Sequence, residues 1–396
     1  MLMLYDKLKL LKRLMTFSLL LLAMGCKQDA IFYYISGETA PTKPRIQGSP
    51  SKIVSVDTNG AEEGGKKLYI ANGRLWEYDI SEPAARWNRS SGPRGYVADV
   101  ASTFDGALYA LAIDNTSTAV WKKTNETGWT TVAPPAEYGF IQNIFGVGDV
   151  LFATGTKRTG DDYDYAILYC RQPNSEFTVV NVVDPPLGAS YLSGAGKIGG
   201  NYYLATMGKG VYKTSDLREA KSAEAIDGKG IPANIAGFFQ TTEPEAIIGI
   251  SRNGYVLYMS AAGLRVDDTS LGGTYTGALA LMDLSQPHEG FDKLLLLGYR
   301  GSNSSYEHGY MELLFKSGDG THEGTRRTPG SNAQISSVSD YRQYDSSARR
   351  YPAAAFWVLE RSGNEESPVI FASTSNQGLY SYRNRSDGGW QWNHEE

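Results

Sequence analysis

The sequence predicts an all-β fold in which seven four-stranded sheets close into a ring. A Pro/Gly turn returns along the 396 residues with steps of 43, 42, 51, 46, 42 and 55 residues, at Pro50, Pro93, Pro135, Pro186, Pro232, Thr274 and Pro329. A second marker follows a strand-like run in each unit and keeps the same phase, at Trp76, Trp121, Tyr169, Tyr212, Tyr258, Met311 and Tyr380. A period in the forties with about four short strands per unit is typical of the blades of a β-propeller.

A closed ring has a physical reason. A single four-stranded sheet exposes two apolar faces, and it is stable only when neighbouring sheets cover both, while closure also removes long bare edges. Two stacked β-sandwiches are the competing hypothesis, but they require no constant period. A helical solenoid is disfavoured because "SDLREAKSAEA", residues 215–225, is almost the only helix-like run.

The unit after Pro93 illustrates the expected blade, with its strands given from the innermost to the outermost: Tyr96–Ser102, Ala107–Ile113, Ala119–Thr124 and Trp129–Val132. Seven blades are favoured over eight because the step of 69 residues between Met311 and Tyr380 is too short for two full units. The first blade would start near Ile53, so no strand exchange between the chain ends is expected unless "IFYYIS", residues 31–36, joins the ring.

The N-terminus predicts export. A basic front end precedes the apolar run Leu14–Met24, which is too short to cross a bilayer and fits a signal peptide. "LAMGC", which ends at Cys26, resembles the lipobox of bacterial lipoproteins, although Ala23 and Met24 depart from its usual pattern. The resemblance implies cleavage after Gly25 and acyl chains, palmitate among them, on Cys26. We therefore expect a signal peptide at 1–25, a lipidated tether at 26–45, a single propeller domain at 46–396, and a lipid-anchored location in the bacterial cell envelope, facing the periplasm or the cell surface.

The composition of the chain limits the classes of partner that we expect. The formal net charge is −5, and it becomes −8 without the first 25 residues, which carry four basic groups and one acid. This balance argues against nucleic acid, whose phosphates require clustered Lys and Arg. If Cys26 is lipidated, Cys170 has no disulfide partner in the chain, and its strand-like surroundings "AILYCRQ" predict a small buried side chain.

Two turns resemble the Asp-box of sialidase-like propellers, which has an acid, then a Gly, then an aromatic residue. Asp387, Gly389 and Trp392 match this order, and "NETGW", residues 125–129, matches it loosely. The resemblance implies a propeller in which the turn is structural. The arginine triad and the Tyr–Glu pair of sialidases have no counterpart that can be placed, so no catalytic residue is assigned.

Two groups of polar side chains are candidate metal ligands. His288, His308 and His322 each neighbour a Glu and fall within one unit, with His394 near the end of the chain. Asp161, Asp162 and Asp164 crowd into "RTGDDYDY". Neither spacing fits a known ligand pattern, so we expect solvated turns, with no metal and no cofactor.

Two functional hypotheses remain. The first is a binding or scaffold module, with a protein or glycan partner, that uses the face where the loops between blades meet the loops joining second to third strands. That face would carry the inserts 156–164 and 301–309, and the residues Arg94, Tyr96, Tyr138, Tyr191, Tyr275, Arg326 and Arg327. The second is a glycan hydrolase or lyase, which would need carboxylates about 5–10 Å apart in the central funnel.

Overall fold

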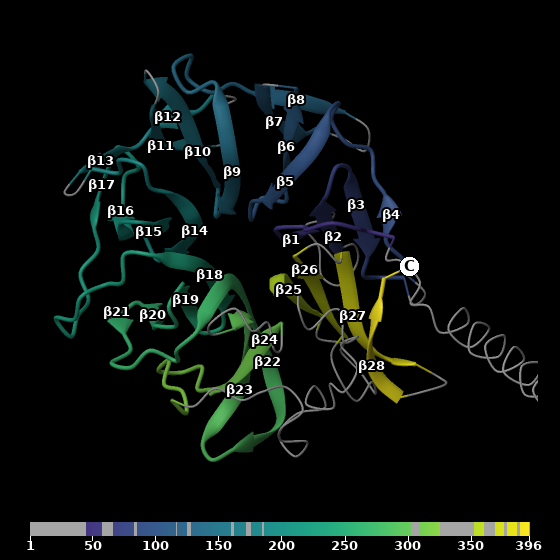
Figure 1. Ribbon diagram of the computed structural model, residues 1–396, viewed down its shortest axis with the longest axis vertical. Coiled ribbons are helices and arrows are strands. Elements are labelled where there is room, and N and C mark those ends of the chain that lie inside the picture. The colour runs from purple at the N-terminus through teal and green to yellow at the C-terminus, as the bar shows by residue number, and fades with distance from the viewer. Residues whose placement is uncertain are drawn as a thin grey trace, which may run out of the picture. The chain divides into compact units, whose positions relative to one another are not determined.

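The computed structural model describes these parts of the chain: 45–57, 66–82, 85–115, 117–124, 128–159, 162–171, 176–183, 186–301, 309–324, 352–359, 369–375, 378–385 and 389–395. Residues Pro44–Glu396 form one compact unit. Within it, seven sheets surround a central channel (Figure 1), so the predicted all-β, seven-bladed propeller is confirmed. No helix in the described ranges is long and apolar enough to cross a bilayer.

The strands of each blade are called A to D from the channel outward. Blade 1 contains β1 (Ile53–Asp57), β2 (Lys66–Ala71), β3 (Leu75–Asp79) and β4 (Asn88–Arg89). Blade 2 contains β5 (Tyr96–Ser102), β6 (Leu108–Asp114), β7 (Ser117–Lys123) and β8 (Trp129–Val132). Blade 3 contains β9 (Phe140–Val147), β10 (Val150–Thr159), β11 (Asp162–Arg171) and β12 (Thr178–Val179).

Blades 4 to 7 complete the ring. Blade 4 contains β14 (Tyr191–Ile198), β15 (Asn201–Met207), β16 (Gly210–Thr214) and β17 (Glu219–Ser222), with β13 (Asn181–Val183) added outside. Blade 5 contains β18 (Ile235–Thr242), β19 (Glu245–Ser251), β20 (Val256–Ser260) and β21 (Gly263–Val266). Blade 6 contains β22 (Thr274–His288), β23 (Phe291–Gly301) and β24 (Tyr310–Phe315), and blade 7 contains β25 (Ala353–Leu359), β26 (Val369–Thr374), β27 (Gly378–Arg385) and β28 (Gly389–His394).

The strand prediction for blade 2 is confirmed to within two residues at every boundary. Five of the blades have the predicted four strands. Blade 4 gains β13, which pairs in parallel with β17, and in the described part of blade 6 a single bridge between Phe315 and His322 stands in place of a D strand.

The core lies between blades, as the ring hypothesis requires. Each apolar cluster is built from two adjacent sheets, and between blades 7 and 1 the rings of Tyr78, Trp87 and Phe371 pack with centroids 5.1–5.6 Å apart. Five of the seven predicted anchors are buried: Trp76, Tyr212, Tyr258, Met311 and Tyr380. Aromatic side chains bury much apolar area each, which explains why these positions mark the repeat.

Backbone irregularities recur at one position. The pairing of strands A and B slips by one residue near the start of strand A in blades 2, 4, 5 and 7. A bulge re-aims the side chains beside it. In blade 4, Ser193 donates its hydroxyl hydrogen bond to the Ile235 carbonyl of blade 5, so the bulge links one blade to the next.

Consecutive blades are also joined at their outer edges. The segment leaving blade 2 forms a parallel bridge from Ala133 to Glu176, β13 extends from blade 3 onto β17, and Ala225 bridges Leu264. These three exit segments thus pair at the outer edge of the following blade. This covers edges that would otherwise invite pairing with another chain.

Within the residues that the structure describes, the ring closes without an exchanged strand. All four strands of blade 7 come from residues 353–394, and the segment before blade 1 is held against them. The Arg45 amide donates to the Glu395 carbonyl at 2.8 Å, Leu379 donates to Ile46, and Gly378 donates to Gly48. The side chain of Ile46 is fully buried. Residues 1–44, including the predicted signal peptide, Cys26 and "IFYYIS", lie outside the described residues.

Candidate interaction face

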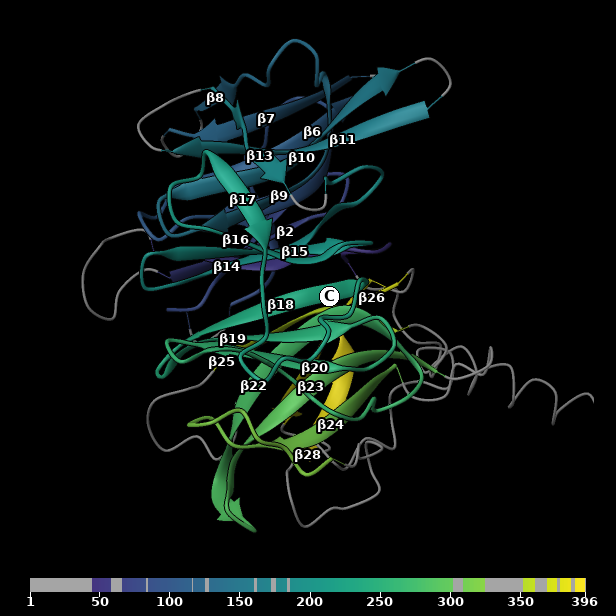
Figure 2. The same cartoon turned by 90° about the vertical axis from the view of Figure 1, so that its left-hand side faces the viewer.

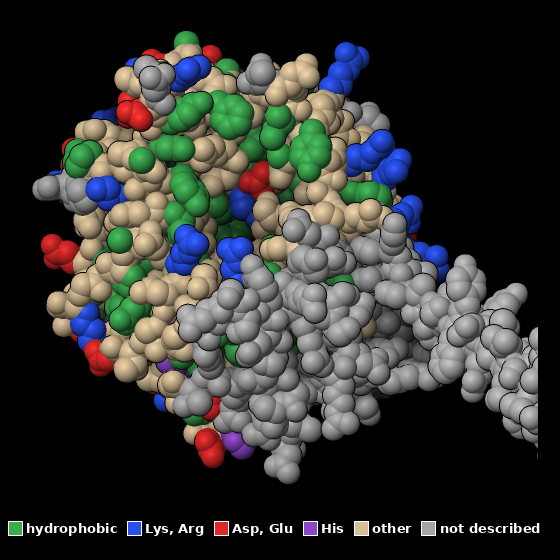
Figure 3. All heavy atoms as spheres, viewed as in Figure 1, with side chains coloured by type: hydrophobic (Ala, Val, Ile, Leu, Met, Phe, Trp, Pro, Cys, Tyr) green, Lys and Arg blue, Asp and Glu red, His purple; other side chains and the backbone are tan. Residues whose placement is uncertain are grey.

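Strand direction divides the ring into two faces. The turns between strands B and C, and the starts of the A strands, lie on one side, here called the B–C face; for example, Tyr96 at the start of β5 pairs with Ile113 at the end of β6. Figure 2 shows the β10–β11 hairpin projecting on this side and the β22–β23 hairpin projecting on the other. Figures 1 and 3 view the B–C face.

Three of the residues proposed for this face are exposed on it. Arg94 is exposed in the connection that leads to β5, Tyr96 starts β5 with 54% of its surface exposed, and Tyr191 starts β14 with 38% exposed. Tyr138 is half-buried beside Leu168, where burial, with Glu137 and Asp164 nearby, raises the pKa of its hydroxyl. Tyr138 therefore contributes more to the blade 3 core than to the surface.

Tyr275 does not belong to this surface. It is only 3% exposed, and its ring packs 5.3 Å from the ring of Tyr299. A Cβ at Gly254 would lie 2.9 Å from the Tyr275 ring, so the ring fills space that a glycine leaves open. The expectation that Tyr275 lines the binding face is wrong for this reason. Arg326 and Arg327 lie outside the described residues.

The two predicted inserts have different outcomes. Residues 156–159 and 162–164 extend the paired strands β10 and β11, because Thr156 pairs with Tyr165 and Thr159 pairs with Asp162. Thr159 also donates to the Asp164 carboxylate at 2.8 Å. Of the second insert, residues 302–308 lie outside the described residues.

Two exposed aromatic residues on this face were not predicted. Phe140 starts β9 with 39% of its surface exposed, and Tyr163 stands on the β10–β11 hairpin with 54% exposed. Together with Tyr96 and Tyr191, they form what we call the aromatic arc, which spans blades 2, 3 and 4. Figure 3 shows hydrophobic side chains gathered over the upper part of this face.

Basic side chains occupy the B–C turns of five blades. These side chains are exposed, and we call the residues that carry them the basic turns: Arg74, Lys157, Arg158, Lys209, Arg252 and Arg300. The described B–C turns carry three acids, Asp114, Asp162 and Asp164. The described residues of these turns are therefore net positive, on a chain whose formal charge is −5. Figure 3 shows Lys and Arg near the mouth of the channel and along the edge over β4.

The central channel contains a single inward ion pair in the described part of blades 1 to 3. Lys52 Nζ lies 2.6 Å from Asp99 Oδ2, contacts the carbonyl of Ile144, and sits 3.8 Å from the centroid of the Phe145 ring. Burial lowers the pKa of Lys52 against the attraction of Asp99. This pair links three blades.

The funnel hypothesis for a glycan enzyme needs converging carboxylates. The described A strands carry only Asp57, Asp99 and Asp283, of which Asp57 and Asp283 stand toward the opposite face. Asp99 is bound by Lys52, and Asp283 by Lys293. These strands therefore do not form the carboxylate pair that glycoside chemistry uses.

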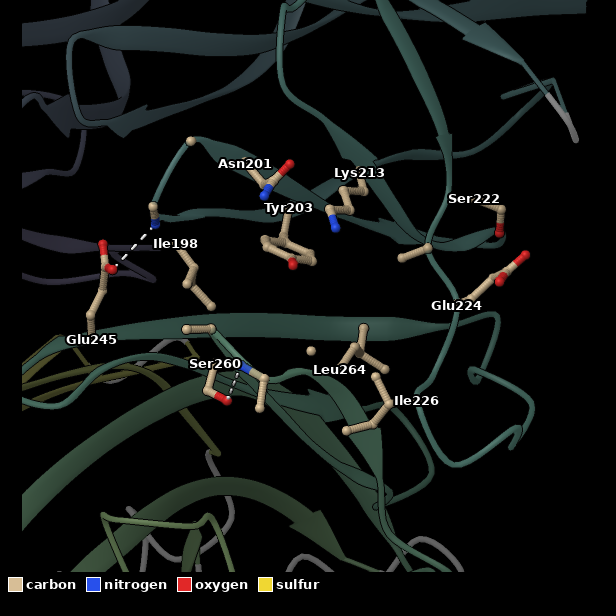
Figure 4. Close-up of a pocket in the computed structure, with 16 residues that line it drawn as sticks. Ile198, Asn201, Tyr203, Lys213, Ser222, Glu224, Ile226, Glu245, Ser260 and Leu264 are labelled. Atoms are coloured by element: carbon tan, nitrogen blue, oxygen red, sulfur yellow. Dashed lines mark hydrogen bonds between the residues drawn. The ribbon is translucent and has the colours of Figure 1, made fainter.

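A cavity of about 600 Å³ opens between blades 4 and 5 on the opposite face. Figure 4 shows Tyr203 and Lys213 pointing into it, with Glu245 and Glu224 at its two ends. Lys213 lies 5.7 Å from the Tyr203 ring, and Glu245 accepts a hydrogen bond from the Gly199 amide at 3.2 Å. Charges of both signs share this cavity, so its lining does not select one ligand class.

The candidate metal ligands are dispersed. His322 is buried, with a side chain 5% exposed, and pairs with Asp267 of blade 5, so the expectation of a solvated turn is wrong for this residue. His288 is half-exposed near Glu289, and His308 and Asp161 lie outside the described residues. Within the described ranges, no three His, Cys, Asp or Glu side chains are grouped as metal ligands would be.

Other predicted features concern structure. Cys170 is 1% exposed and burial raises the pKa of its thiol, which confirms a buried side chain. The acids of the two Asp-box-like turns, Glu126 and Asp387, lie outside the described residues. Trp392 is buried in the cluster between blades 6 and 7.

Comparison with known proteins adds only structural likeness. No model of a known protein family matches the chain, and no curated protein is similar to it in sequence. Its fold is similar to the WD40 β-propeller domain of Doa1, with a TM-score of 0.49, 9% identity, and coverage of 87% of this chain and 96% of that one. It is also similar to BBS1N, solved in complex with ARL6DN, with a TM-score of 0.43, 12% identity, and coverage of 84% and 91%.

Proposed function

We propose that this chain is a binding module of a bacterial cell envelope, anchored to a membrane through lipid on Cys26, which receives a protein partner on its B–C face. The observation that carries the proposal is the aromatic arc beside the basic turns on one side of the ring. Aromatic residues and Arg are enriched where protein interfaces derive most of their binding energy.

The charge on this face favours an acidic partner. The basic turns are net positive while the whole chain is acidic, so complementary potentials would orient an incoming acidic surface. Asp114, Asp162 and Asp164 stand among the basic groups. They would repel a continuous row of phosphates, which is why a protein surface fits better than nucleic acid.

A pair of photo-crosslinking variants tests the face. A crosslinking amino acid at Tyr163, on the B–C face, is expected to trap a discrete acidic protein in intact envelopes. The same amino acid at Phe104, which is 71% exposed on the opposite face, is expected to trap none. Equal products at both positions would contradict the assignment of the face.

The aromatic arc gives the second readout. Replacing Tyr96, Phe140 and Tyr191 together with Ala is expected to lower the Tyr163 crosslink yield by about tenfold or more, because a few central aromatic residues carry most of the binding energy of an interface. Phe104→Ala is the matched control and should leave the yield unchanged. An unchanged yield in the triple variant would argue against the arc.

The anchor has its own test. Cells fed an alkyne analogue of palmitate are expected to label the wild-type chain and not Cys26→Ala, and the variant is expected to leave the membrane fraction. Cys170 is a built-in control because it is buried and its thiol pKa is raised. Label retained by Cys26→Ala would contradict the proposed anchor while leaving the face untouched.

A further inference from the structure

The cavity between blades 4 and 5 holds one cation and one anion on separate strands. Lys213 lies in β16 of blade 4, directly opposite Tyr203 of β15, and both side chains point into the cavity (Figure 4). Glu245 is the first residue of β19 in blade 5 and stands at one end of the cavity. The composition of the lining selects no ligand class by itself, but the placement of these two charges does.

Hydrogen bonds between the two blades fix the walls of this cavity. Gln240 of β18 accepts a hydrogen bond from the Lys197 amide at 3.0 Å and donates one to the Lys197 carbonyl at 2.7 Å. This double bond between blades lies one residue before the cavity lining begins at Ile198. The Glu245 carboxylate accepts a hydrogen bond from the Gly199 amide at 3.2 Å, in the turn between β14 and β15. The anion therefore stands where the two blades are joined, with its position set by backbone.

The cation and the anion of the cavity are not paired with each other. The Lys213 ammonium lies 5.7 Å from the centroid of the Tyr203 ring, within the range of a cation–π contact. Among the residues that the structure describes, neither Lys213 nor Glu245 forms an ion pair, whereas Lys221 on the next strand lies 3.2 Å from Glu219. A ligand that carries both charges can neutralise the two groups at once, which neither group does for the other.

From this arrangement, we propose that the cavity between blades 4 and 5 binds a small linear zwitterion, with its carboxylate at Lys213 and its ammonium group at Glu245. Both contacts are charge-assisted hydrogen bonds, which are stronger than neutral ones. Across the cavity from Lys213, Leu264 and the 58% exposed Ile226 supply apolar surface for the methylene groups of the ligand. The volume of about 600 Å³ accommodates such a chain. The inference goes beyond the proposed function, because this cavity opens on the face opposite to the B–C face.

Calorimetry with ω-amino acids of increasing length, from glycine to 6-aminohexanoate, tests the inference on the purified full-length chain. The alkylamine and the carboxylate ion of the same length are the singly charged controls. We expect at least one ω-amino acid to bind at least tenfold more tightly than both of its controls, and its binding to weaken as salt screens the two contacts. The length that binds most tightly measures the separation of the two charges. Equal affinity of every ω-amino acid and its controls would overturn the proposal.

Two variants assign the two contacts separately. Lys213→Gln is expected to weaken the zwitterion to the affinity of the alkylamine without weakening the alkylamine, because it removes only the partner of the carboxylate. Glu245→Gln is expected to weaken the zwitterion to the affinity of the carboxylate ion without weakening that ion, and it keeps an oxygen for the Gly199 amide. A loss caused by Glu224→Gln, at the other end of the cavity, in place of Glu245→Gln would contradict the assigned position of the ammonium group.

Lys221→Gln and Glu219→Gln are the matched controls, because these residues pair with each other on β17 and do not line the cavity. Both should leave the affinity for the zwitterion unchanged, and unchanged melting temperatures in all variants confirm folding. Unchanged affinity in both Lys213→Gln and Glu245→Gln would reject the site. A chain that binds the zwitterion but gives no Tyr163 crosslink would contradict the proposed function alone, and the reverse result would contradict this inference alone.

Discussion

Gly146→Ala is expected to lower the free energy of unfolding by about 3 kcal/mol or more, because the added methyl group has no room between two blades. A Cβ at Gly146 in β9 would lie 1.9 Å from the carbonyl oxygen of Ser102 at the end of β5. The obstacle is backbone, which cannot rotate away as a flexible side chain can. Blade 3 would have to move away from blade 2, and the ring could not close as before.

Urea unfolding, followed by tryptophan fluorescence, measures this effect. Gly230→Ala is the matched control, because a Cβ there meets nothing within 4 Å and the residue has no left-handed backbone. That variant should change stability by less than about 1 kcal/mol, since it mainly restricts the unfolded chain. Equal unfolding midpoints for the two variants would show that blade contact does not limit the ring.

The close packing of neighbouring blades also explains which features of the fold could be predicted from the sequence. Repeats of Pro/Gly turns and buried anchors follow from the need of each sheet to be covered on both sides, so the blade count and the strand order were accessible. The addition of β13 to blade 4 was not, because Asn181–Val183 is a short run whose pairing with β17 depends on a blade further along the chain.

The exposure of residues on the B–C face was predicted in part. Tyr96 and Tyr191 are exposed because they start A strands at the rim, and the same reasoning failed for Tyr275. The fold places Gly254 beside that ring and lets it turn inward, which a sequence pattern does not reveal.

A signal for the basic turns was present in the sequence. The motifs "NGR", "TKR", "GKG", "SRN" and "YRG" place Lys or Arg just after the second strand in five of the seven units. Counting charge over the whole chain hides this pattern, because the acids outnumber the bases. Counting charge at one position of the repeat shows it, since equivalent positions of a propeller lie on one face.

Asp99→Ala is expected to destabilise the fold by about 3 kcal/mol, because it leaves the part-buried ammonium group of Lys52 without its counter-charge. Besides Lys52, the Asp99 carboxylate accepts hydrogen bonds from Ser51 Oγ at 3.2 Å, from the Val100 amide at 2.9 Å and from the Ile144 amide at 3.0 Å. One side chain therefore serves blades 1, 2 and 3 together, and its loss leaves donors from all three unsatisfied.

An exposed pair is the control. Asp283 is 56% exposed beside Lys293, and Asp283→Ala should cost at most about 1 kcal/mol, because solvent screens such pairs. If the two substitutions lower the free energy of unfolding equally, the Lys52–Asp99 pair stabilises the fold no more than a surface ion pair does.

The pH dependence of the free energy of unfolding tests whether the unpaired charge of Lys52 causes the loss of stability. Burial already lowers the pKa of Lys52 below its ordinary value of 10.5, and removing Asp99 takes away the attraction that opposes this shift. Below 10.5, the unfolded chain then binds more protons at this lysine than the folded chain, so stability rises with pH. The loss in free energy of unfolding that Asp99→Ala causes should therefore become smaller as the pH rises from 7 toward 10. A deficit that stays constant over this range would mean that lost hydrogen bonds, and not an unpaired charge, explain the cost.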